Sequence, residues 1–136
     1  MERQDYLKRQ IDQLGKVLGE LLAKLTGSGN NTDAAETLEI VNQVLDENLD
    51  LDIEQLLNIP ERQFIEALKR NELLNDTNLE TLADLLALLA KRDSSRRKSI
   101  ANRALLIYEH LEQSNKTFSF TRNQKMESAR GLLAHQ

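Results

Sequence analysis

The sequence predicts an all-α protein of about six helices, and three observations carry that prediction. Helix-forming residues dominate the 136-residue chain, which holds only one proline and five glycines. Aromatic residues make up 4% of the chain, so its core must consist of leucine, isoleucine, valine and alanine at helical spacing. No alternating run of β-branched residues indicates a sheet.

The first predicted helix, over residues 1–27, carries the most regular pattern in the chain. Its apolar residues recur at alternating steps of four and three, the spacing of a heptad seam: Leu7, Ile11, Leu14, Leu18, Leu21 and Leu25. Because such a stripe must be buried against another helix, we expect this helix to act as an interaction or dimerisation arm. Three heptads also fit a helix that packs on its own domain, and the pattern leaves both readings open. Gly15 and Gly19 lie beside the seam and predict the close approach of a second helix.

Residues 32–136 are expected to form one helical domain that begins with three helical segments. Thr32 or Asp33 can cap the first of these, which ends near Asn48. A short helical turn follows, and Pro60 suits the first turn of the third segment.

Four acidic residues around that short turn have part of the spacing of a calcium-binding loop: Asp50, Asp52, Glu54 and Glu61. The position that needs glycine for the sharp turn of such a loop holds Gln55. Helix caps and a solvent-exposed acidic face therefore explain these residues better than a metal site, and no metal or cofactor is expected.

Two longer helices joined by a charged link are expected over residues 79–113, followed by a capping helix over 121–134. Asp76 or Thr77 can cap the first of them. Thr121, with a glutamine three residues later, has the form of a capping box for the last helix.

The hairpin over residues 79–113 resembles a tetratricopeptide-type hairpin, because the segment 101–109 carries the small residue, Ala-Leu and Tyr-Glu placement typical of such repeats. With an amphipathic first helix that begins at 6–11, and with Phe118 and Phe120 before the final helix, the whole chain resembles a family of uncharacterised small bacterial all-helical proteins. The resemblance implies no catalytic residue. We expect the two phenylalanines to fill the gap between the last two helices.

Several classes of function are disfavoured by what the chain lacks. It has no cysteine, which excludes thiol nucleophiles, disulfides and cysteine-ligated metals. It has no glycine-rich phosphate loop, nucleophile elbow or zinc-protease motif, so we expect no enzyme. The longest apolar run, 82–90, contains Asp84 and is far shorter than the roughly 20 residues of a membrane span. A cytoplasmic protein is therefore expected.

One basic cluster stands out in a chain of net charge −4, within residues 91–98: Lys91, Arg92, Arg96, Arg97 and Lys98. Its arginines and Lys98 could contact phosphates, which makes a small nucleic-acid-binding regulator the alternative function. No interleaved aromatic residue or helix-turn-helix signal accompanies them, and a single charge run is usually a solvated link. The sequence favours a non-catalytic interaction or scaffold module that packs a helix against a partner protein or a second copy.

Overall fold

The computed structural model describes residues 2–27, 32–115 and 119–134, and within them the chain forms seven α-helices and no strand. The all-α prediction is confirmed, and the seventh helix, α3, is the predicted short turn. The helices are α1 (Glu2–Thr26), α2 (Ala34–Leu49), α3 (Ile53–Asn58), α4 (Glu61–Lys69), α5 (Asp76–Arg92), α6 (Arg97–Ser114) and α7 (Phe120–Ala134). None of these helices is long and apolar enough to cross a bilayer.

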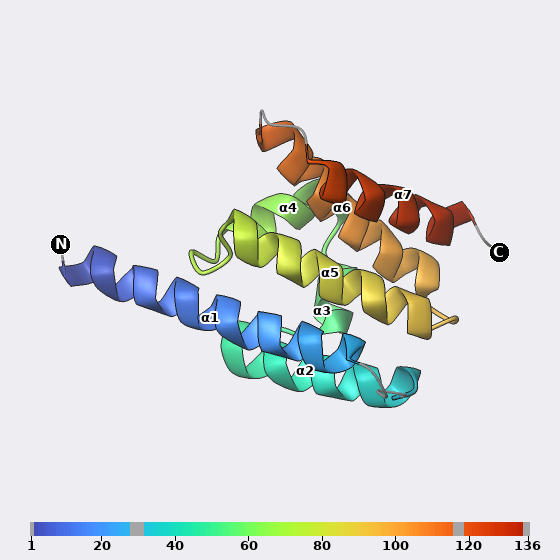
Figure 1. Cartoon of the computed structure of the whole chain (residues 1–136), viewed down its shortest axis with the longest axis horizontal. Helices are drawn as coiled ribbons and strands as arrows, with labels where there is room; N and C mark the ends of the chain where they lie inside the picture. Colours follow the sequence, from blue (N-terminus) through green and yellow to red (C-terminus); the bar gives the residue numbers. More distant parts are fainter. Residues whose placement is uncertain (1, 28–31, 116–118, 135–136) are drawn as a thin grey trace.

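Helix α5 lies at the centre of the arrangement, with α1 and α2 on one side and α6 and α7 on the other (Figure 1). The α5–α6 pair is antiparallel, because Asp84 contacts Tyr108 while Ala90, further along α5, contacts Arg97 at the start of α6. This central position explains the apolar character of α5, which must be covered on several sides. Its buried residues are Asn78, Leu79, Leu82, Ala83, Leu85, Leu86, Leu89 and Ala90.

Two of the predicted caps are confirmed. The carboxylate of Asp33 accepts a hydrogen bond of 2.8 Å from the Glu36 backbone N–H at the start of α2. Asp52 and Gln55 form a reciprocal capping box at the start of α3. Asp50, another member of the acidic group, has a left-handed backbone conformation at the C-terminus of α2, with φ of 56°. These residues therefore begin and end helices.

The other two cap predictions are wrong by one or two residues. Asn75, and not Asp76 or Thr77, caps α5 by accepting a 2.9 Å hydrogen bond from the backbone N–H three residues later. The hydroxyl of Ser119 accepts the equivalent bond, of 3.1 Å, at the start of α7, where Thr121 was expected to do so. In both cases the helix begins earlier than the apolar pattern indicates, because polar first turns carry no periodic signal.

Helix α7 packs on α6 without the expected phenylalanine plug. Phe120 is 68% exposed, so that expectation is wrong for this residue, and Phe118 lies outside the described residues. Met126 and Ala129 provide the buried contacts instead. They lie one helical turn apart, whereas Phe120 lies in the first turn of α7, where its position is solvent-facing.

Candidate interaction site

The heptad seam of α1 divides into two parts at Leu14. Its last four members are buried in the chain's own core: Leu14, Leu18, Leu21 and Leu25. Helices α2 and α5 both contact α1. The structure therefore assigns this part of the seam to intramolecular packing, one of the two readings that the sequence leaves open.

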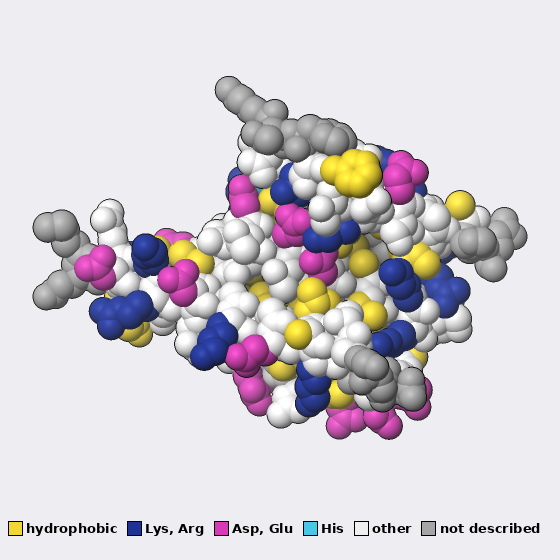
Figure 2. Space-filling view, viewed as in Figure 1, with side chains coloured by type: hydrophobic (Ala, Val, Ile, Leu, Met, Phe, Trp, Pro, Cys, Tyr) yellow, Lys and Arg dark blue, Asp and Glu magenta, His cyan; other side chains and the backbone are white. Residues whose placement is uncertain are grey.

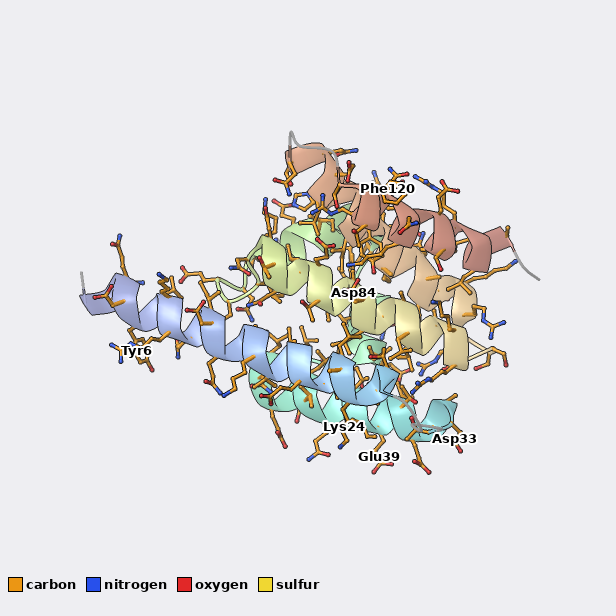
Figure 3. All side chains as sticks on the ribbon, viewed as in Figure 1. Tyr6, Lys24, Asp33, Glu39, Asp84 and Phe120 are labelled. Atoms are coloured by element: carbon orange, nitrogen blue, oxygen red, sulfur yellow. The ribbon has the colours of Figure 1, made fainter. Side chains whose placement is uncertain are left out.

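The first two members of the seam lie outside that core. Leu7 and Ile11 are only half-buried and do not belong to the apolar side chains packed in or against the core of the described chain. Tyr6 beside them is 61% exposed and lies on the end of α1 that projects past the other helices (Figures 1 and 3). We call residues 3–11 the α1 arm. The apolar stripe thus continues beyond the part of the helix that the protein itself covers.

Asn78 holds α1 at the root of the arm. Its side chain is 2% exposed, and its Nδ2 donates hydrogen bonds of 3.1 Å to the carbonyl of Ile11 and 2.8 Å to that of Leu73. A Cβ added to Gly15 would lie 2.9 Å from Asn78 Oδ1, so glycine is what allows α5 to approach here. Gly19, whose added Cβ would meet nothing within 4 Å, has no comparable packing role. One of the two expected close approaches is therefore present.

The charged residues of the arm have both signs. Arg3, Lys8 and Arg9 are exposed beside Asp5, and Figure 2 shows basic and acidic side chains next to one another on the projecting end. Such a mixture gives no strong field of one sign. The apolar surface of the arm therefore comes from Tyr6 and the two seam residues.

Two of the basic residues assigned to phosphate contact bind the protein's own backbone. Arg92 donates hydrogen bonds to the Leu25 carbonyl at 2.7 Å and to the hydroxyls of Thr32 and Thr37 at 2.9 and 3.1 Å. Arg97 donates to the carbonyls of Ala90 and Lys91 at 3.0 and 2.9 Å. Both guanidinium groups thereby satisfy carbonyl oxygens at helix C-termini, which otherwise lack donors.

The other two candidates for phosphate contact, Arg96 and Lys98, differ in their surroundings. Arg96 forms an ion pair of 3.4 Å with Asp93, whose carboxylate also accepts hydrogen bonds from Ser95. Burial alone would raise the pKa of Asp93, but the bonds from Ser95 and Arg96 lower it below its ordinary value. Lys98 is exposed and makes no ion pair with the described residues. The cluster therefore offers much less free positive charge than its sequence indicates.

Sequence reasoning missed a polar cluster that connects α5, α6 and α7. Tyr108 donates a 2.5 Å hydrogen bond to Asp84, and Lys125 lies 3.1 Å from Asp84 and 2.9 Å from Glu80. Arg122 lies 3.0 Å from Glu80 and 3.2 Å from Glu112. The available signal was Asp84 itself, which interrupts an apolar run and lies near the middle of the molecule (Figure 3).

The pKa shifts in this cluster all favour its existing protonation states. Burial would raise the pKa of Glu80, but hydrogen bonds from Lys125 and Arg122 hold it below its ordinary value. Burial would lower the pKa values of Lys125 and Arg122, and their carboxylate partners raise both. Burial and the Asp84 carboxylate together raise the pKa of Tyr108. The cluster therefore consists of stable ion pairs and a neutral tyrosine.

Comparison with family models, curated proteins and solved structures finds no match for this chain. Of the resemblance inferred from the sequence, the structure supports only the general description of a small all-helical protein, with seven helices among the described residues. The candidate site must accordingly be interpreted from its own geometry.

Proposed function

We propose that this protein is a non-catalytic interaction module that presents the α1 arm to a partner protein. The observation that carries the proposal is the division of the seam, in which four residues fill the core while Leu7 and Ile11 lie outside it and stay partly exposed. Burial of such side chains contributes about 25 cal/mol for each Å² removed from water, before association costs. A helix that projects from the body can enter a partner without any rearrangement of its own core.

The size of the exposed stripe favours a partner with a groove over a second arm. Leu7 and Ile11 are already half-buried, so with Tyr6 they can cover only a few hundred Å² per copy, below the roughly 800 Å² per partner of a standard interface. An apolar groove surrounds a helix on several sides and covers more of it. We therefore propose helix-in-groove binding, with a partner that accepts an amphipathic helix of mixed charge.

The helical body serves as the scaffold for the arm in this proposal. The antiparallel α5–α6 pair, which resembles a tetratricopeptide hairpin, holds α1 through the apolar face of α5 and through Asn78. A fixed root limits the conformational entropy that the arm loses when it binds.

The geometry supports a catalytic or nucleic-acid-binding role less well. Glu80, Arg122 and Lys125 of the polar cluster have pKa shifts that stabilise their present charges, whereas a general acid or base needs a pKa near the working pH. Of the four candidates for phosphate contact, Arg92 and Arg97 already have backbone acceptors and Arg96 is paired with Asp93.

A photo-crosslinking amino acid at position 7 tests the proposal in cells that naturally make the protein. We expect a discrete cross-linked product from position 7 and none from position 13, an exposed site on the same helix. The amount of this product should fall when Ile11→Glu is added. It should stay the same with Gln10→Glu, a matched change at an exposed arm position. Equal cross-linking from both positions, or none from position 7, would contradict the proposal.

The mass of the cross-linked product identifies the class of partner. A product of twice the chain mass of 15.5 kDa would mean that a second copy covers the arm, which would overturn the groove-bearing partner. Circular dichroism and urea unfolding of the Ile11→Glu variant should match the wild type, because Ile11 lies outside the core. That control separates loss of binding from loss of folding.

A further inference from the structure

A hollow beside the N-terminal part of α6 has an unusual lining. It has a volume of about 340 Å³, near the lower end of the range for small-molecule sites. It is formed by residues from α3, α4, α6 and α7, namely Leu57, Glu61, Lys98, Ser99, Asn102, Arg103 and Leu133. Neither the α1 arm nor the polar cluster contributes to it.

Arg103 in this lining has an unsatisfied donor. The residue is only 9% exposed, and its Nη2 donates a 3.1 Å hydrogen bond to the carbonyl of Leu57. Its Nη1 is buried without any acceptor, and no other buried side-chain nitrogen or oxygen of the described residues is in that position. A buried polar atom without a partner is costly and often marks an absent water or ligand.

The aromatic neighbour of Arg103 does not supply that acceptor. The guanidinium carbon lies over the ring of Phe64, 5.1 Å from its centroid. This cation–π contact leaves Nη1 without a hydrogen-bond acceptor. Arg103 also has no carboxylate within ion-pair distance among the described residues, so its buried charge lacks a counter-ion.

Three further donors of α6 line the same hollow without partners. The side chains of Lys98, Ser99 and Asn102 form no hydrogen bond or ion pair with the part of the chain that the structure describes. Their spacing of one and four residues places them on one face of α6 with Arg103. Four side chains with donor groups therefore border one hollow, and one of them is Arg103 with its unsatisfied Nη1.

The charges and apolar residues of the lining indicate which class of ligand the hollow could bind. Lys98 and Arg103 contribute two positive charges and Glu61 one negative charge, so the lining favours a single negative charge over two. Leu57 and Leu133 add an apolar part. We propose that the hollow binds a small organic carboxylate, with its carboxylate on Arg103 and Lys98 and its hydrocarbon part on the two leucines.

Titration of the full-length protein with hexanoate, followed by two-dimensional amide NMR, tests this proposal. We expect saturable shifts of amides in residues 97–103, with a Kd on the order of 1 mM for so small a ligand. Acetate, which lacks the hydrocarbon part, should bind several-fold more weakly. Inorganic phosphate should also bind more weakly, because its second charge meets Glu61.

Matched variants assign the binding to the hollow. Lys98→Ala should weaken hexanoate binding several-fold, while Lys91→Ala, an exposed lysine outside the hollow, should leave it unchanged. Glu61→Gln should strengthen binding, a gain that a misfolded variant could not show. Absence of saturable shifts in the wild type, an unchanged Kd in Lys98→Ala, or phosphate binding as tight as hexanoate binding would overturn the proposal.

Discussion

Asn78 Oδ1 lies 2.9 Å from the point where a Cβ on Gly15 would stand, so the start of α5 packs directly on the backbone of α1. The amide of Asn78 cannot easily turn away, because its Nδ2 is bonded to the carbonyls of Ile11 and Leu73. This contact marks the boundary between the covered part of α1 and the projecting arm.

Alanine at the two α1 glycines should have opposite effects on stability. Gly19→Ala should raise the free energy of unfolding by about 0.5 to 1 kcal/mol, because alanine is the better helix former and nothing lies within 4 Å. Gly15→Ala should lower it by about 1 kcal/mol, since the clash with Asn78 outweighs that gain. Urea unfolding of both variants measures these changes. A similar gain in unfolding free energy in both variants would refute the close approach of Asn78 to Gly15.

Truncation along the seam should show where the core of α1 ends. Leu18→Ala should cost about 2 to 5 kcal/mol of unfolding free energy, because Leu18 is 0% exposed. Leu7→Ala should cost less than about 1 kcal/mol, because Leu7 does not pack on the core. Chemical denaturation measures both values. A large cost at Leu7 would mean that the arm belongs to the folded body.

Arg92 should act as a structural residue. Arg92→Ala removes three hydrogen bonds that join α5 to the end of α1 and to Thr32 and Thr37, and it should cost about 1 to 3 kcal/mol. Arg92→Lys should recover little of the lost stability, because an ammonium group cannot reproduce the planar geometry of the guanidinium. The exposed Lys98→Ala serves as the comparison and should be nearly neutral. Equal stability of all three variants in urea would contradict this role.

Acid should weaken the docking of α7 through Glu80. The pKa of Glu80 is lower in the folded protein than its ordinary value of 4.5, so its stabilising contribution is complete above about that pH. The contribution is lost as the pH falls through the lowered folded value. Glu80→Gln should therefore flatten the dependence of unfolding free energy on pH below about pH 5.

The exposed Glu39→Gln provides the control for that experiment and should keep the wild-type slope. Amide hydrogen exchange adds a local readout, because protection in α7 should fall more steeply with acid than protection in α2. A wild-type slope in Glu80→Gln would show that the ion pairs of Glu80 with Lys125 and Arg122 do not stabilise the fold.

Local features of the fold were largely readable from the sequence. Helical periodicity located most helices, and the side chains of Asp33 and Asp52 identified two N-caps, because both signals depend on residues within one turn. Asn75 and Ser119 were missed because several polar residues precede each helix and only the backbone conformation selects one of them.

The sequence by itself determined the all-α class and the stripe along α1. Only the tertiary structure decided which part of that stripe is covered, because coverage depends on where α5 begins beside α1, at the contact of Asn78 with Ile11. It likewise decided that Arg92 binds carbonyl and hydroxyl oxygens, while Arg103 retains an unsatisfied donor. Periodicity fixes the face on which a side chain lies, but the groups opposite that face come from distant parts of the chain.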